Sequence, residues 1–419
     1  MSELRRELRD GWRNLAAATI GIMTGIAAYI PISSLFFRAI ETNFGWSKTA
    51  SAASLLALPI TAAVLPGAGR LVDKLGVRRV VAVSIASTLL AYLWLSQIGN
   101  SKAQFYMGFL ALNVLGCATG PLAYSRLVVG DFNKARGTAL AIALAGIACA
   151  TISLPPLVYH IIAVYTWRGG YAFFACLTLV GGLAALLMMQ PRSVPGAAAH
   201  SSNLLETEGS CAKAAIVSGA FWSLGSAIFF ISAGTIGLVS QLQSLLVEAG
   251  LTARVAAWHL SLLGFSVGIS RLIIGRLLDL SSPARTTAIV LVIASLGALA
   301  LRFGSGGSGA MALGVVLIGS SAGAELDIMA FFCSRLFGLR KFGIHYGSLF
   351  AFHYVGMAAG GLMYGSIYDR TGRYSDALMA SFGALLISGG IFLLLDRPSA
   401  RIAVDSMDIE KPEASHAAA

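Results

Sequence analysis

Long apolar segments alternate with short polar ones along the whole chain. Twelve of these segments are each long enough to cross a hydrocarbon core of about 30 Å. Because lipid cannot satisfy open backbone groups, the segments are predicted to be helices, and the short period-two segments of a membrane barrel are absent. The pattern therefore predicts an all-α membrane protein with twelve transmembrane helices. They cover approximately residues 14–37, 49–71, 80–98, 105–128, 138–164, 171–189, 214–246, 253–279, 286–302, 311–336, 346–368 and 377–395.

A short sequence at the end of the second predicted helix recurs at the end of the eighth. The first copy is GRLVDKLGVRR at residues 69–79, and the shorter second copy is GRLLD at residues 275–279. About half of the chain separates them. The residues before the two helices also correspond, and Ser47 and Thr252 are predicted to be their N-caps. A duplication at this spacing is typical of transporters built from two homologous halves.

The duplication and the polar segments predict the division of the chain. Residues 1–190 are expected to form an N-terminal six-helix half and residues 214–396 a C-terminal six-helix half. The Pro-containing polar segment 191–213 is expected to be a cytoplasmic linker, and residues 397–419 a cytoplasmic tail. The first apolar run is too long for a signal peptide core and lacks a cleavage site, so it is predicted to be a retained helix.

Composition and charge agree with a membrane protein and set its predicted orientation. Hydrophobic residues make up 57% of the chain and charged residues 12%, about half of the usual charged share. Lys and Arg concentrate in the segments that a cytoplasmic N-terminus would place inside, which predicts that both termini are cytoplasmic in a bacterial inner membrane. The net charge of +11 is spread over many loops, so no nucleic-acid partner is expected.

The duplicated motif resembles the signature loop of the major facilitator superfamily. In that family the loop lies between helices two and three of a twelve-helix bundle in two halves, and it acts as a latch that stabilises one alternating-access state. The resemblance implies gating roles for Gly69, Asp73, Arg78 and Arg79, and for Gly275 and Asp279 in the second copy. The alternative interpretation is a plain cytoplasmic charge cluster.

A second resemblance concerns the eighth predicted helix. Residues 265–275, FSVGISRLIIG, are similar to helix eight of the monocarboxylate and oxalate–formate transporter group, where an arginine at the position of Arg271 binds the substrate carboxylate. The residue itself supports this role, because it lies eight residues before Asp279, about 12 Å from the helix end. An intramembrane arginine is costly and usually functional, and its planar fork matches a carboxylate. The alternative is a structural ion pair with an acid on another helix.

Three titratable residues lie at a similar predicted depth in the C-terminal half. Glu325 and Asp327 are two residues apart on one helix, so they are expected to point to different faces. Either could take up a proton when substrate neutralises Arg271, or form a permanent salt bridge. His353 stands near the point where oxalate transporters have a lysine, which weakens any prediction of oxalate. It is a candidate titratable substrate contact or a buried hydrogen-bonded histidine.

The N-terminal half offers aromatic and amide candidates. Tyr29 and Tyr124 resemble the cavity aromatics of the same group, and Asn113 is a further candidate. Core packing is the alternative for all three. A cationic wall from the C-terminal half and an aromatic wall from the N-terminal half would suit a small anion with an apolar portion.

These features favour a secondary transporter of small organic carboxylates that is coupled to protons and works by rocking of the two halves. The sequence leaves two alternatives open: an anion exchanger without a proton step, and a membrane sensor with a transporter fold. No nucleophile–base pair, metal-ligand spacing or phosphate-binding loop stands out, so neither an enzyme nor a cofactor or metal is expected. The oligomeric state is not predicted.

Overall fold

The described part of the chain is helical throughout. The structure, a computed structural model, describes residues 2–132, 136–190, 219–304, 307–337 and 342–395, and these contain no strand. The helices are α1 (Ser2–Asp10), α2 (Trp12–Thr24), α3 (Ile26–Tyr29), η1 (Ile30–Ile32), α4 (Ser33–Phe44), α5 (Lys48–Ala52), η2 (Ala53–Leu56), α6 (Ala57–Leu75), α7 (Val77–Ser96), α8 (Lys102–Gly116), η3 (Cys117–Thr119), α9 (Pro121–Asp131), α10 (Arg136–Met188), α13 (Gly219–Glu248), α14 (Ala253–Leu280), α15 (Pro283–Phe303), α16 (Ser308–Phe337), α17 (Phe342–Thr371) and α18 (Ser375–Leu395).

The predicted all-α membrane fold is confirmed, although the number of spans depends on how breaks are treated. Within the described residues, nine helices are long and apolar enough to cross a membrane, or ten if the bent pair Trp12–Thr24 and Ile26–Phe44 is one span. Helix α10 covers two predicted spans and is interrupted at Thr166, where φ is 62°. Helix α17 has the length of a span but is not among the nine. The predicted linker and tail lie outside the described residues.

Two spans of the N-terminal half are broken where they touch each other. The first span bends by 44° between α2 and α3, at Gly25, and the fourth contains the short helix η3. A Cβ atom on Gly25 would lie 2.0 Å from the carbonyl oxygen of Thr119, so only glycine permits this contact. The freed N–H of Ile26 donates to Thr119 Oγ1 at 3.1 Å. A neighbouring side chain thus satisfies the backbone group that the break leaves without a helical partner.

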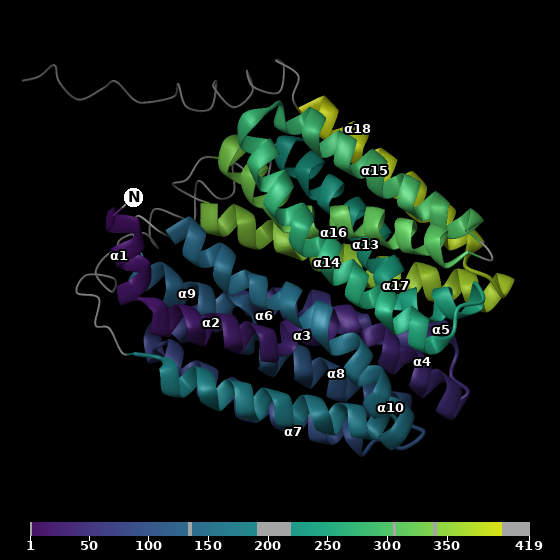
Figure 1. Cartoon of the computed structure of the whole chain (residues 1–419), viewed down its shortest axis with the longest axis horizontal. Coiled ribbons are helices and arrows are strands. Elements are labelled where there is room, and N and C mark those ends of the chain that lie inside the picture. The colour runs from purple at the N-terminus through teal and green to yellow at the C-terminus, as the bar shows by residue number, and fades with distance from the viewer. Residues whose placement is uncertain (1, 133–135, 191–218, 305–306, 338–341, 396–419) are drawn as a thin grey trace, which may run out of the picture.

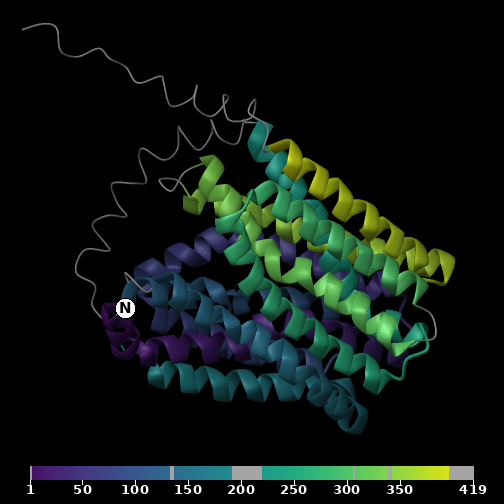
Figure 2. The same ribbon diagram turned by 45° about the horizontal axis from the view of Figure 1, so that its top comes forward.

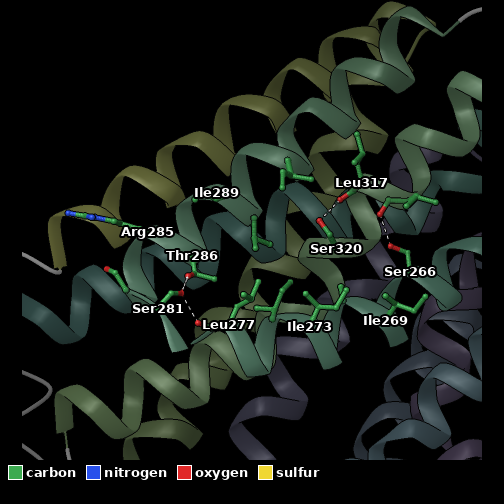
Figure 3. Close-up of a pocket in the computed structure, with 16 residues that line it drawn as sticks. Ser266, Ile269, Ile273, Leu277, Ser281, Arg285, Thr286, Ile289, Leu317 and Ser320 are labelled. Carbon is green, nitrogen blue, oxygen red and sulfur yellow. Dashed lines mark hydrogen bonds between the residues drawn. The ribbon is translucent and has the colours of Figure 1, made fainter. Parts of the chain in front are cut away.

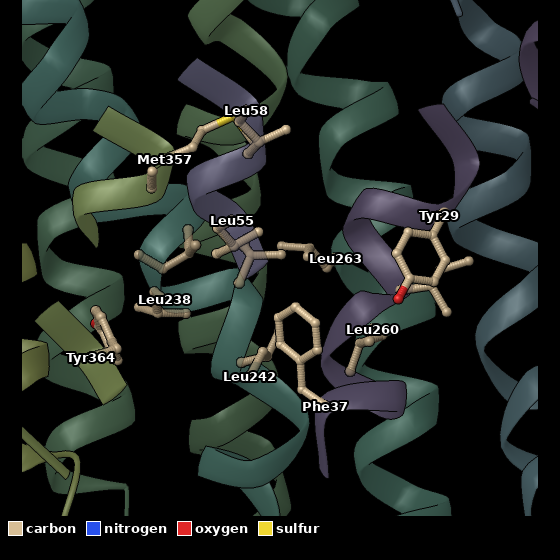
Figure 4. Packing of buried hydrophobic residues seen from close by; sticks show 14 of the residues in the cluster. Tyr29, Phe37, Leu55, Leu58, Leu238, Leu242, Leu260, Leu263, Met357 and Tyr364 are labelled. Atoms are coloured by element: carbon tan, nitrogen blue, oxygen red, sulfur yellow. The ribbon is translucent and has the colours of Figure 1, made fainter. Parts of the chain in front are cut away.

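The two halves lie side by side and converge toward one end of the molecule (Figures 1 and 2). This end, called here the Lys48 end, holds the start of α5 and the end of α17. One buried apolar cluster contains residues of both halves, and Figure 4 shows part of it. Its members there include Phe37, Leu55 and Leu58 of the N-terminal half and Leu238, Leu263 and Met357 of the C-terminal half.

The opposite end, called the Arg78 end, is organised differently. It holds the junction of α6 with α7 and the start of α2. The buried apolar residues of the N-terminal half at this end, among them Leu15, Val72 and Met189, form a second cluster that contains no residue of the C-terminal half. A shared apolar core therefore joins the halves at the Lys48 end and not, within the described residues, at the Arg78 end.

Candidate functional site

Helices α14 and α16 pack closely in the C-terminal half because glycines face serines. A Cβ atom on Gly319 would lie 2.6 Å from Ser266 Oγ, and one on Gly323 would lie 2.1 Å from Ser270 Oγ. The two glycines are four residues apart, which is the small-residue spacing that lets membrane helices approach. This contact places the side chain of Arg271, the residue after Ser270, beside the α16 backbone.

Arg271 forms an ion pair with Asp327 across this contact. Its Nε lies 3.4 Å from Asp327 Oδ2 and donates to the carbonyl oxygen of Gly323 at 3.4 Å. The side chains are 20% and 33% exposed, so the pair is reachable from outside the packed core. The carboxylate oxygen nearest to the guanidinium has no hydrogen-bond partner within the described residues. No hydrogen bond from the two terminal guanidinium nitrogens is found there either.

A second polar cluster lies deeper in the same half and joins three helices. Glu325 of α16 is 2% exposed, and its Oε1 lies 2.7 Å from Nδ1 of His353 on α17. Ser232 Oγ of α13 donates to the same carboxylate oxygen and lies 3.0 Å from His353 Nδ1. Glu325 and Asp327 therefore face different partners, as the two-residue spacing predicts. The structure brings together Arg271 with Asp327, and Glu325 with His353.

The aromatic candidate Tyr29 lies in a cluster of rings inside the N-terminal half. Its hydroxyl is 3.0 Å from that of Tyr171, and its ring lies 5.3–6.0 Å from five other rings. The ring contacts are with Phe36, Tyr92, Phe109, Tyr171 and Phe174. Tyr29 is fully buried in this conformation, so the structure places it in packing, and a role in substrate binding stays a prediction.

Tyr124 and Asn113 are also buried within the N-terminal half. The ring of Tyr124 fills the space that a side chain at Gly21 of α2 would occupy, and its hydroxyl has no hydrogen-bond partner among the described residues. Asn113 Nδ2 donates to the carbonyl oxygen of Phe109, four residues earlier on its own helix, at 2.9 Å. Neither residue lies among the contacts of the Arg271 site, and their substrate-binding roles are untested predictions.

A polar contact between the halves closes the Lys48 end. The carboxylate of Asp369, near the end of α17, accepts hydrogen bonds from the backbone N–H groups of Lys48 and Thr49 at 2.9 Å each. Lys48 Nζ donates to Ser244 of α13 at 2.9 Å and pairs with Glu41. The first N–H groups of a helix lack intrahelical partners, and here the other half supplies one. The N-caps predicted at Ser47 and Thr252 are confirmed.

The two copies of the duplicated motif begin near the ends of α6 and α14, and the first glycine of each copy has open space around it. A Cβ atom added to Gly69 or to Gly275 would have none of the described atoms of its neighbours within 4 Å. Arg78 and Arg79 are exposed. No described neighbour therefore packs against Gly69 or Gly275 in this conformation. The side chains of Asp73 and Asp279 are not among those that the structure describes, so their predicted gating roles are untested.

Comparison with known proteins identifies the family. The family model described as "Major Facilitator Superfamily" matches residues 15–361, and this range includes both copies of the motif and the Arg271 site. The chain belongs to the Major Facilitator Superfamily. It is an integral membrane protein and a transporter of this superfamily, which confirms the coarser part of the functional prediction and leaves the monocarboxylate group untested.

The relatives of this superfamily member are distant in sequence. It is 22% identical over 394 residues to an "MFS-type transporter" of Gibberella moniliformis, covering 93% of this chain and 92% of that one. It is 25% identical over 323 residues to a 38 kDa protein in a 23S RNA operon of Thermoproteus tenax, covering 76% and 79% of the two chains.

Two solved structures share the superfamily fold. One is a bacterial homolog of the human lysosomal transporter Spinster in an inward-facing and unoccupied conformation, with TM-score 0.71, 12% identity and coverage of 92% and 96% of the two chains. The other is a mutant of the nucleoside transporter NupG, with TM-score 0.75, 13% identity and coverage of 92% and 100%. At these identities the likeness shows the fold alone.

Several contacts of this site have no signal in the sequence. Ser232 is one serine among several in α13, and only its position beside Glu325 distinguishes it. Lys48 and Asp369 are 321 residues apart in the chain. Helix periodicity does not show which helix ends meet, so the sequence did not indicate this contact.

Proposed function

We propose that this transporter moves a small organic carboxylate, coupled to protons, by alternating access, and that Arg271 binds the substrate carboxylate. The observation that carries the proposal is which nitrogens of the Arg271 guanidinium are already in contact with protein groups. Asp327 and the Gly323 carbonyl contact Nε only, at 3.4 Å, which leaves the terminal nitrogens to form the two parallel hydrogen bonds that a carboxylate accepts from arginine.

Asp327 would act as the counter-charge that substrate replaces. An unpaired arginine inside a membrane is costly, so the empty site needs a carboxylate of its own. The 3.4 Å separation and the 33% exposure of the Asp327 side chain support an ion pair that opens when a better-placed carboxylate arrives. Binding would then exchange one carboxylate for another at constant charge on the arginine.

The Ser232–Glu325–His353 cluster is the proposed proton site. Glu325 is almost fully buried, and its Oε1 lies 2.7 Å from Nδ1 of His353. Imidazole groups commonly carry protons in proteins. A proton bound within this cluster alters the net charge close to the substrate site on the same helix, α16. The positive charge of the bound proton would thereby offset the negative charge of the bound anion before the two halves rock.

The contacts between the halves support a particular conformational state. The predicted orientation makes the Arg78 end cytoplasmic and the Lys48 end extracellular. The shared apolar core and the Asp369–Lys48 contact lie at the Lys48 end, so the conformation is proposed to be closed outside and open inside.

Uptake into proteoliposomes tests the proposed function. A panel of labelled monocarboxylates, dicarboxylates and nucleosides would be offered with and without an inward proton gradient. The panel would be run for wild type, Arg271→Ala and Arg254→Ala, whose exposed arginine lies at the other end of α14. We expect gradient-driven accumulation of a carboxylate, lost in Arg271→Ala and kept in Arg254→Ala.

The other outcomes separate the alternatives. Counterflow that requires Arg271 but ignores the proton gradient would support the anion exchanger. Uptake of nucleosides alone, or normal carboxylate uptake by Arg271→Ala, would contradict the carboxylate assignment and leave only the superfamily fold. Absence of any uptake with intact binding of a ligand would favour the sensor.

A further inference from the structure

A pocket lies between α14, α15 and α16, apart from the site of Arg271. Its volume is about 620 Å³, and neither Arg271 nor Asp327 lines it. Figure 3 shows it as a row of apolar side chains, including Ile269, Ile273 and Ile289, with Ser281 and Arg285 at one end. This pocket is called the α14–α15 groove below.

The α14–α15 groove opens toward the lipid. Most of the isoleucines that line it are exposed on the outside of the helices, with Ile289 60% and Ile273 53% exposed, while Ile274 is buried. Their helices are among those apolar enough to cross a membrane, so side chains exposed there meet acyl chains rather than water. An occupant of this groove must therefore be apolar over most of its length.

The groove has the length of a lipid tail and begins at a membrane surface. It extends from Ser266 of α14 to Ser281 just beyond the helix end, a distance of about 22 Å at the helical rise. One leaflet accounts for about 15 Å of the hydrocarbon core. Ser281 directly follows α14, and Arg285 lies in the first turn of α15, so this end reaches the headgroup region.

At the polar end of the groove, Arg285 is the group available to bind an anion. The hydroxyl of Ser281 donates to the carbonyl oxygen of Leu277 at 2.7 Å and lies 2.6 Å from the hydroxyl of Thr286, so these protons are already used. Arg285 is exposed and has no ion pair among the described residues. None of the described residues that line the groove is acidic.

We propose that the α14–α15 groove binds an anionic phospholipid, with an acyl chain along its isoleucines and the phosphate paired with Arg285. A guanidinium matches phosphate in geometry and charge, and basic residues at a membrane surface select anionic lipids. The occupant sits between α14, which carries Arg271, and α15. This site is independent of which substrate the transporter moves.

Native mass spectrometry of the purified full-length protein tests the proposal. The probes are dioleoyl phosphatidylglycerol, dioleoyl phosphatidylcholine and glycerol phosphate. The variants are Arg285→Gln, Ile289→Trp, which fills the groove, and Arg13→Gln as the matched control. Arg13 is exposed and lies at the start of α2, at the same predicted membrane surface and outside the groove.

The expected result separates the headgroup from the tail. Arg285→Gln should lower phosphatidylglycerol binding about fivefold. It should lower phosphatidylcholine binding less, because the choline cation already offsets the phosphate charge of that lipid. Ile289→Trp should lower the binding of both lipids, and Arg13→Gln should change neither. Equal phosphatidylglycerol binding by wild type and Arg285→Gln would overturn the proposal. So would unchanged lipid binding by Ile289→Trp, or binding of glycerol phosphate as tightly as phosphatidylglycerol, which would indicate a site for free phosphate.

Discussion

The two halves of this transporter place different chemistry in their interiors. In the N-terminal half, Tyr29 and its neighbouring rings fill the interior, and the polar contact of Tyr29 is a hydroxyl–hydroxyl hydrogen bond. In the C-terminal half, one stretch of α16 carries Glu325 and Asp327, each facing a basic partner. Membrane helices pack well without charges, and buried charges are costly. We therefore infer that the C-terminal half carries substrate recognition and proton coupling, while the aromatic cluster of the N-terminal half provides a rigid packing surface.

The largest effect is expected from removing the buried charge of the C-terminal half. Glu325→Gln keeps the shape of the side chain but cannot ionise, so the proposed proton site is lost. We expect gradient-driven accumulation to disappear while counterflow exchange of the same carboxylate continues. Uptake with and without a proton gradient, compared with counterflow in the same vesicles, measures the difference. Accumulation at the wild-type level would place proton coupling elsewhere.

The close packing of α14 against α16, which places Arg271 beside Asp327, can be tested at Gly323. Gly323→Ala would put a Cβ 2.4 Å from the backbone oxygen of Val267, so α14 and α16 must separate and Arg271 must move. We expect a clear fall in melting temperature together with loss of transport. At Gly268 the nearest atom to an added Cβ is Ala148 Cβ at 3.4 Å, so Gly268→Ala is the matched control. Equal melting temperatures for the two variants would show that the close contact is not needed.

A smaller effect is expected where the halves meet. Asp369→Asn weakens the acceptor for the N–H groups of Lys48 and Thr49, and loss of a helix cap costs about 1 kcal/mol. The balance should shift toward the state open at the Lys48 end by about fivefold. Spin-label distances across that end would report the populations, with Asp376→Asn as the control because Asp376 lies on α18 and pairs with Arg302 of α15. An unchanged distribution would mean that this cap does not hold the halves together.

The smallest effect is expected from a change in the aromatic cluster of the N-terminal half. Tyr29→Phe removes the hydrogen bond to Tyr171 and keeps the ring contacts, so the free energy of unfolding should fall by about 1 kcal/mol. Thermal unfolding in detergent checks this, with Tyr165→Phe, whose side chain is exposed, as the comparison. A larger loss of transport than of stability would show that the Tyr29 hydroxyl touches substrate.

The pattern of apolar segments predicted the fold because span length is fixed by the bilayer. The breaks were harder to foresee. Gly25 is an ordinary residue of a membrane helix, and only its contact with Thr119 shows why the span bends there. The interruption of α10 at Thr166, in contrast, falls between the predicted spans 138–164 and 171–189, where the apolar pattern separates two helices.

The charged site was partly predictable. Helix spacing placed Arg271 and Asp327 at equal depth and turned Glu325 to another face, and the structure pairs them accordingly. The helix period gives depth and face but not the neighbouring helix. Ser232 and Asp369 were therefore missed, since contacts between residues far apart in the chain depend on how helices pack.

The most direct test compares the two halves in one binding measurement. Once the transported carboxylate is known, its dissociation constant would be measured by equilibrium dialysis for wild type, Arg271→Lys and Tyr29→Phe. Lysine keeps the charge but loses the planar fork, so Arg271→Lys should weaken binding about tenfold or more, while Tyr29→Phe should stay within about threefold of wild type. Unchanged affinity in Arg271→Lys, with a large loss in Tyr29→Phe, would contradict the assignment of recognition to the C-terminal half.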